Sequence, residues 1–309
     1  MALALLVDPD WTQAAAQALA ARRPDLQIVT ERARMEGPDI RYIVTFNPPP
    51  GTFARLPGLR LIISPGAGAE KLLESADLPA GVPLARVVDP ATNLGITQYV
   101  VYMLLRELRA FAGYEAQQRI GLWKRIAVPS AAEATVGILG LGSLGRQVAQ
   151  VLLGLGFPVV GWSRTQHALP GIRCLSGEGG LEQCLRQSRF LVCLLPLTAE
   201  TRGILDARRL SWLPAGAYLV NVARGAHVVA ADLLQHLDAG HLSGAALDVH
   251  VPEPLPPEDP LWRHPRVTVT PHIAWRTSAA AMAEQVCANI ERLERGEPLA
   301  NAVVRERGY

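Results

Sequence analysis

The sequence predicts an α/β protein built from two doubly wound parallel sheets. The chain has 309 residues, which is enough for two domains of ordinary size. Apolar runs of strand length alternate with amphipathic helical segments almost throughout, as parallel sheets with helices on both faces require. Hydrophobic residues make up 49% of the chain and charged residues 19%, a composition that excludes a disordered or fibrous protein.

The charge balance, the cysteines and the N-terminus limit the expected partners. The 30 basic residues exceed the 28 acidic ones by two, too small an excess for a protein that binds nucleic acid. The opening apolar run, residues 2–7, is too short to span a membrane. The four cysteines show no C-x-x-C pair and no metal-ligand spacing. We therefore expect a cytoplasmic protein with reduced thiols, no metal site and no membrane or nucleic-acid partner.

The first hundred residues contain five strand candidates, most of them bounded by proline or glycine. They are residues 2–7, 27–30, 42–46, 61–64 and 82–88. One long helix is predicted next, over about residues 97–120, because Val100, Leu104 and Leu108 recur at helical spacing.

Six further strand candidates follow, most of them continuous apolar runs with helical segments between them. They are residues 135–139, 159–162, 190–195, 217–222, 244–249 and 267–270. A last helix is predicted at 277–295, and the Pro-rich piece 252–260 is predicted to be a rigid surface turn.

A glycine-rich turn follows the first of these six strands. Gly140, Gly142 and Gly145 form the pattern G-x-G-x-x-G between a strand and a helix. The first glycine allows a tight turn, the second lets a pyrophosphate approach the backbone, and the third lets helix and strand pack closely. The N–H groups at the helix start, around Ser143 and Leu144, would face the phosphates. The pattern predicts a Rossmann-type dinucleotide site.

The second of these six strand candidates, residues 159–162, leads into the turn that distinguishes NAD from NADP in Rossmann-type sites. An NAD site usually has an acidic residue there, whereas this chain has Arg164 between the hydroxyls of Ser163 and Thr165. A guanidinium can hold a 2′-phosphate through two hydrogen bonds. The sequence therefore predicts a preference for NADPH, with NADH still possible; the alternative is a solvated loop arginine.

Arg224, Glu253 and His272 come shortly after the fourth, fifth and sixth of these strands. The C-terminal ends of parallel strands line the ligand crevice of an open α/β sheet, so three such groups indicate a catalytic site. Taken singly, they could be a turn arginine, a solvated glutamate and a core histidine. The other six histidines lack this placement.

Several motifs resemble the D-isomer-specific 2-hydroxyacid dehydrogenase family. They are residues 64–68 (SPGAG), 194–203 (LLPLTAETRG), 221–225 (NVARG), 248–256 (DVHVPEPLP), 270–273 (TPHI) and the tail 307–309. Within the family, the chain is similar to members that reduce glyoxylate and hydroxypyruvate. That likeness rests on residues 162–165 (WSRT), Gln117 and Gln118 ahead of Trp123, and residues 254–262 (PLPPEDPLW).

The resemblance implies a discontinuous flavodoxin-like substrate domain, residues 1–96 plus 276–309. A Rossmann-type dinucleotide domain, residues 97–275, would be inserted in it. Family members usually dimerise through the cofactor domain, so the resemblance also implies a homodimer.

The resemblance further assigns roles to single residues. Arg224 would bind the substrate carboxylate and polarise the C2 carbonyl. His272 would donate the proton, with Glu253 holding its ring and stabilising the imidazolium. The backbone N–H groups of Ala67 and Gly68 would bind the other end of the carboxylate.

For the cofactor, Asp248 would accept a hydrogen bond from the nicotinamide carboxamide. The groove for the dinucleotide would be lined by Leu195, Pro196, Val222 and Ala223. Two positions depart from the family. His250 stands where an aromatic residue is common, and Trp275 stands where the side chain is often small. The Trp275 indole would either crowd the pocket and favour short substrates or point into the domain interface.

These observations predict an NADPH-preferring reductase of short 2-oxo acids such as glyoxylate and hydroxypyruvate. One alternative is a dinucleotide-sensing, corepressor-like binding protein. Another is a different dehydrogenase of the same family, such as a phosphoglycerate or formate dehydrogenase. The complete Arg–Glu–His set favours the reductase over the sensor.

Overall fold

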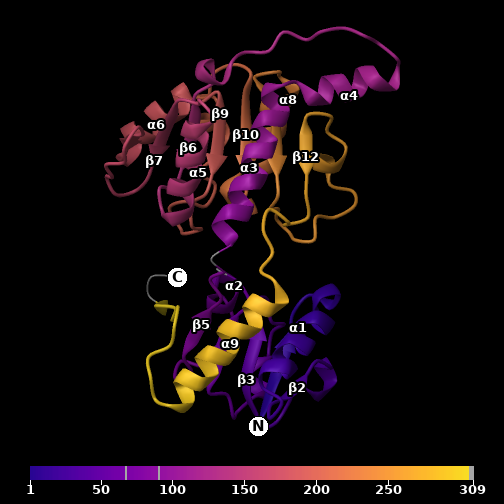
Figure 1. The fold of residues 1–309 in the computed structure, drawn as a ribbon, viewed down its shortest axis with the longest axis vertical. Coiled ribbons are helices and arrows are strands. Elements are labelled where there is room, and N and C mark those ends of the chain that lie inside the picture. The colour runs from indigo at the N-terminus through magenta and orange to yellow at the C-terminus, as the bar shows by residue number, and fades with distance from the viewer. Residues whose placement is uncertain (67, 90, 306–309) are drawn as a thin grey trace. The chain divides into compact units, whose positions relative to one another are not determined.

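The computed structural model describes residues 1–66, 68–89 and 91–305, which form two compact units (Figure 1). Unit 1 comprises Met1–Thr92 and Arg276–Tyr309, and unit 2 comprises Asn93–Trp275. Unit 1 is therefore built from both ends of the chain. In the described part of the chain, no helix is both long and apolar enough to cross a membrane.

Unit 1 is a five-stranded parallel sheet with the strand order β2-β1-β3-β4-β5, which is the order 2-1-3-4-5 of flavodoxin-like folds. Its elements are β1 (Ala2–Leu6), α1 (Pro9–Arg22), β2 (Gln27–Val29), η1 (Arg32–Arg34), β3 (Ile40–Thr45), η2 (Phe53–Arg55), β4 (Leu61–Ser64), α2 (Glu70–Leu73), β5 (Leu84–Arg86) and α9 (Ala279–Glu294). Helix α9 packs along α1, and its Val286 and Ile290 belong to one buried cluster with Leu3, Leu5 and Leu19. The C-terminal segment thus completes the core of the N-terminal sheet.

Unit 2 is a seven-stranded parallel sheet with the order β12-β11-β10-β9-β6-β7-β8. Its elements are α3 (Thr92–Leu108), α4 (Phe111–Arg119), η3 (Ala131–Glu133), β6 (Val136–Leu139), α5 (Ser143–Gly154), β7 (Val159–Trp162), β8 (Arg173–Leu175), α6 (Gly177–Gln187), β9 (Phe190–Cys193), α7 (Ala207–Leu210), β10 (Ala217–Asn221), η4 (Gly225–His227), α8 (Ala230–Asp238), β11 (Leu242–Leu247), η5 (Pro260–Trp262) and β12 (Val267–Val269). The chain runs from β6 outward to β8 and then returns to β9 on the other side of β6. The order is that of a Rossmann fold with one further strand, and it reverses between β6 and β9.

The structure adds one strand to the six predicted for unit 2. The extra strand, β8, has only three residues and pairs with β7 at the edge of the sheet. A strand this short, with an exposed arginine and no apolar run, gives no periodic signal. The other predicted strands and the last helix end within two residues of their observed bounds.

The single long helix predicted over residues 97–120 is wrong, because the chain breaks it into α3 and α4. Ala110 lies between them with φ +54°, in the left-handed region. Neither glycine nor proline marks the break, and Phe111 keeps the apolar spacing although it is 54% exposed. Beyond the break, α4 and the segment after it extend away from the sheet of unit 2 (Figure 1).

Candidate active site

The glycine-rich turn joins β6 to α5 at the point where the strand order of unit 2 reverses. Gly140 has φ +107°, and a Cβ on it would lie 2.8 Å from the carbonyl oxygen of Leu194. A Cβ on Gly145 would lie 1.8 Å from the carbonyl oxygen of Gly140. A Cβ on Gly142, the N-cap of α5, would meet no atom within 4 Å. The first N–H groups of α5 therefore border open space, and the pyrophosphate of a dinucleotide fits this turn.

The turn after β7 contains the residues expected to select the cofactor. The hydroxyl of buried Ser163 donates to the carbonyl of Thr165 at 2.8 Å, and Arg164 between them is exposed. At the start of α5, Ser143 Oγ accepts a hydrogen bond from Asn93 at 2.9 Å. Ser163 thus closes the turn while the Arg164 guanidinium is accessible from solvent.

The predicted groove residues lie at the ends of β9 and β10. Leu195, Val222 and Ala223 are buried, and Pro196 is exposed. The fully buried His227 joins these two strand ends, because its Nε2 donates to the Pro196 carbonyl at 3.3 Å. No sequence pattern predicts a role for this histidine, since its partners are backbone atoms.

Arg224 lies in the turn that follows β10 and is half-buried. The buried Asn221 shapes this turn with both ends of its amide. Its Nδ2 donates to the Arg224 carbonyl at 2.9 Å, and its Oδ1 accepts from the Ala223 N–H at 3.2 Å. The Arg224 N–H lies 3.2 Å from Nδ1 of His227, which accepts its hydrogen bond. Asn221 and His227 therefore fix the backbone from which the guanidinium projects.

Glu253 and His272 form a direct pair, with Nδ1 of the ring 2.9 Å from Oε2 of the carboxylate. The other carboxylate oxygen, Oε1, accepts the N–H of His250 at 2.8 Å. The side chains of Glu253 and His272 are 36% and 41% exposed, so solvent and small molecules reach them. Burial opposes ionisation of Glu253, but the hydrogen bonds from His272 and His250 outweigh it, and the pKa of Glu253 lies below its ordinary 4.5.

His272 itself sits in an unusual backbone conformation, with φ +55°. Its N–H donates to the carbonyls of Asp248 at 2.8 Å and Thr270 at 3.1 Å. A side chain other than glycine in the left-handed region costs about 1 kcal/mol, so surrounding bonds must hold this turn.

Asp248, at the end of β11, supplies much of that support. It is 1% exposed, and its carboxylate accepts the Thr270 hydroxyl at 2.6 Å and the N–H groups of Ile273 and Ala274, both at 2.8 Å. Tyr99 on α3 donates in turn to the Thr270 hydroxyl at 2.7 Å, and burial raises the pKa of this phenol to about 12. The hydrogen bonds of Asp248 therefore stabilise the turn that carries His272.

The three expected catalytic residues thus follow adjacent strands, β10, β11 and β12, at one edge of the sheet. Neighbouring strands lie about 4.8 Å apart, so a small molecule can span the three ends. A cation, a carboxylate and an imidazole there can bind an acid and move a proton beside the dinucleotide turn.

Of the two residues of unit 1 that are expected to contact the substrate, the structure describes one. Ala67 lies outside the described residues, and the carbonyl of Gly68 accepts the hydroxyl of Ser64. In unit 2, the Trp275 indole lies against the start of α3, where a Cβ on Gly95 would be 1.8 Å from its Cε3 atom.

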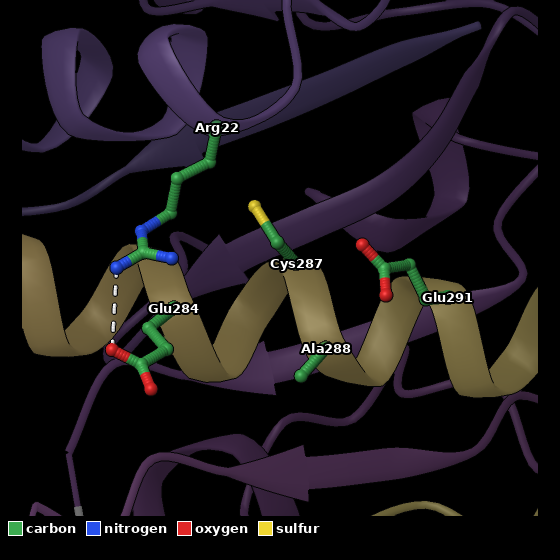
Figure 2. Close-up of a pocket in the computed structure, with 5 residues that line it drawn as sticks. All are labelled: Arg22, Glu284, Cys287, Ala288 and Glu291. Atoms are coloured by element: carbon green, nitrogen blue, oxygen red, sulfur yellow. Dashed lines mark hydrogen bonds and ion pairs between the residues drawn. The ribbon is translucent and has the colours of Figure 1, made fainter.

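Unit 1 also has a surface groove, between α1 and α9, which contains none of the predicted site residues. It is lined by Arg22, Glu284, Cys287, Ala288 and Glu291 (Figure 2). Burial raises the pKa of the Cys287 thiol, which makes it a poor nucleophile, and Arg22 is paired with Glu284 at 3.2 Å. The described residues contain no cluster of three or more side chains suited to a metal ion.

A Rossmann-type unit in which a carboxylate holds a histidine ring at the strand ends is typical of a dinucleotide-dependent oxidoreductase. The profile of the family described as D-isomer specific 2-hydroxyacid dehydrogenase, NAD binding domain, matches residues 101–274. A glyoxylate/hydroxypyruvate reductase A of Salmonella newport is 42% identical over 275 residues, which are 87% of each chain. The chain belongs to the D-isomer-specific 2-hydroxyacid dehydrogenase family, and it is an NAD(P)-dependent oxidoreductase.

Two solved structures are similar along almost their whole length. A family member from Xanthobacter autotrophicus Py2, in complex with NADPH and MES, is 42% identical with a TM-score of 0.89, over 100% of this chain and 99% of that one. An NADPH-dependent glyoxylate/hydroxypyruvate reductase from Sinorhizobium meliloti, in complex with NADP and sulfate, is 36% identical with a TM-score of 0.90, over the same shares.

Proposed function

We propose that the protein is an NADPH-preferring reductase that converts short 2-oxo acids, such as glyoxylate and hydroxypyruvate, into 2-hydroxy acids. The 2.9 Å contact between His272 Nδ1 and Glu253 Oε2 carries the proposal, because the carboxylate orients the ring that would donate the proton from Nε2. The Salmonella relative, which carries the reductase name, supports the substrate class.

The residues present fit the cofactor. The pyrophosphate would lie on the N–H groups of Ser143 and Leu144 beside Gly142, and Arg164 would bind the 2′-phosphate. The side chains of Leu195, Val222 and Ala223, together with Pro196, would line the groove for the dinucleotide. When bound, NADPH supplies the hydride that C2 of the substrate receives. The Xanthobacter relative was solved with NADPH, which supports this preference.

The polar residues bind the substrate and transfer the proton. Arg224 binds the substrate carboxylate with its planar guanidinium and polarises the C2 carbonyl. As negative charge grows on the carbonyl oxygen, Nε2 of His272 delivers a proton to it, and Glu253 stabilises the ring through Nδ1. The N–H groups of Ala67 and Gly68 bind the second carboxylate oxygen, and Asp248 orients the carboxamide.

We further propose that the protein works in the cytoplasm as a homodimer formed by unit 2. An exposed apolar arm, residues 111–125, supports the dimer. Within it, Trp123 is 98% exposed, and Phe111, Ile120 and Leu122 are also exposed. So many large apolar side chains on one segment indicate a surface that another chain covers.

The test is the initial rate of NADPH and NADH oxidation with glyoxylate, hydroxypyruvate, pyruvate and 2-oxobutyrate. Higher kcat/KM with NADPH and the first two acids is the expected result. Selectivity for pyruvate or 2-oxobutyrate would keep the family and contradict the substrate class. Tight NADPH binding without turnover of any acid would instead favour a dinucleotide-sensing protein.

A further inference from the structure

His250 bonds Glu253 directly, and it shares a backbone acceptor with His272. Its backbone N–H donates to Oε1 of Glu253 at 2.8 Å. Its ring Nε2 lies 3.2 Å from the carbonyl oxygen of Thr270, and because a carbonyl only accepts, Nε2 carries the proton. The same carbonyl accepts the N–H of His272 at 3.1 Å.

The side chain of His250 is nearly buried and lies beside a small cavity. The residue is 8% exposed, and its Nδ1 has no protein partner among the described residues. It borders a cavity of about 50 Å³, together with Asn221, Val251 and Asp259.

The hydrogen bond from the His250 ring to the Thr270 carbonyl connects His250 to the turn that carries His272. His272 projects from a left-handed turn with φ +55°, and the Thr270 carbonyl is one of two acceptors of its N–H. The His250 ring fixes the direction of this carbonyl from the side of β11. At the same time its backbone N–H fixes the carboxylate that holds the His272 ring.

We propose that His250 is a positioning residue that keeps the His272 ring aligned with the Glu253 carboxylate. The proposal rests on the proposed function for its effect on turnover, but not for its effect on the ring. A misalignment of about 1 Å at a reacting group can lower a rate by up to about a hundredfold, so a single lost hydrogen bond here is measurable.

Three substitutions separate the ring's hydrogen bond from its volume. His250→Phe keeps the ring size and the backbone N–H but removes the donor to Thr270. His250→Gln places an amide donor near the position of Nε2, whereas His250→Asn is too short to reach. The Gln and Asn variants form a matched polar pair, which decides the matter even if the Phe variant fails to fold.

We expect His250→Phe and His250→Asn to lower kcat for glyoxylate on the order of tenfold. KM and the dissociation constant of NADPH should change less than twofold, and His250→Gln should regain most of kcat. A merely structural role would lower stability in all three variants without this split. Equal kcat in all three variants and the native protein would overturn the proposal.

A second readout does not need turnover. Nitrogen shifts of the His272 ring, assigned with His272→Gln, report at alkaline pH which ring nitrogen carries the proton. We expect protonated Nδ1 in the native protein and in His250→Gln, and a shift toward protonated Nε2 in the Phe and Asn variants. An unchanged tautomer in those two would overturn the proposal. If the native protein reduces no 2-oxo acid, the proposed function fails while this readout still decides the role of His250.

Discussion

At the scale of single residues, the charge of Glu253 depends on its hydrogen bonds. Burial disfavours the charged carboxylate, yet hydrogen bonds from His272 and His250 lower its pKa below 4.5. A carboxyl whose folded pKa is lowered stabilises the fold fully above its unfolded pKa, and this contribution disappears as pH falls through the folded value. Its contribution is therefore complete at neutral pH and is lost in the acid range below 4.5.

We therefore expect Glu253→Gln to lower the free energy of unfolding by about 1 kcal/mol at pH 7. The difference from the native protein should shrink as pH falls below 4.5, because the native carboxylate then becomes protonated. Urea unfolding at pH 7 and at several pH values down to 3 measures it. Glu258→Gln, an exposed glutamate of the same loop, serves as the control. A difference that stays constant with pH would contradict the charge-dependent origin.

Arg164 decides a second prediction at this scale. Arg164→Asp should raise KM for NADPH at least about tenfold, because the 2′-phosphate loses a cation and meets an anion. KM for NADH should stay the same or fall, since an acidic residue there can accept hydrogen bonds from the ribose hydroxyls. Steady-state kinetics with both cofactors provide the comparison. Equal KM values for NADPH before and after the substitution would remove Arg164 from the site.

At the scale of elements, the glycine turn separates packing from ligand binding. A Cβ on Gly145 would clash with the carbonyl of Gly140 at 1.8 Å, whereas a Cβ on Gly142 would stand in open space. Gly145→Ala should therefore destabilise the fold by about 2–3 kcal/mol. Gly142→Ala should change stability by less than about 0.5 kcal/mol but weaken NADPH binding at least about tenfold.

Thermal unfolding and cofactor titration of both variants test this division. Normal NADPH affinity in Gly142→Ala would mean that the phosphates do not approach this backbone. Normal stability in Gly145→Ala would mean that α5 can move away from the turn without cost.

The elements also show where sequence patterns lose information. The continuous apolar runs of the inner strands are confirmed within two residues, because burial on both faces demands them. The edge strand β8 gave no signal, since its three residues are partly exposed and its pairing with β7 comes from the sheet itself. The break at Ala110 was equally invisible, because the exposed surface of α4 tolerates the same apolar spacing as a buried helix.

At the scale of the whole molecule, the arm of residues 111–125 should control assembly. Trp123 is 98% exposed in the single chain, and the proposed dimer would cover it. Trp123→Ser should therefore turn the dimer into a monomer, because losing an indole that the interface buries costs at least about 2 kcal/mol of association. Sedimentation velocity at micromolar concentration measures the change. Trp262→Ser, which removes another exposed indole of unit 2, should leave the assembly unchanged. A native protein that sediments as a monomer would contradict the homodimer.

The sequence by itself determined the two parallel sheets, the dinucleotide turn and the strand ends that carry Arg224, Glu253 and His272. These features follow from apolar runs, glycine spacing and local order along the chain, which are properties of neighbouring residues. The pairing of Glu253 with His272 is already implied by the family resemblance, whereas only the tertiary structure decided that His227 and His250 hold backbone carbonyls of other loops. The contacts of His227 and His250 reach backbone atoms up to 31 positions away, and the direction of those atoms depends on the folded sheet and leaves no trace in residue type.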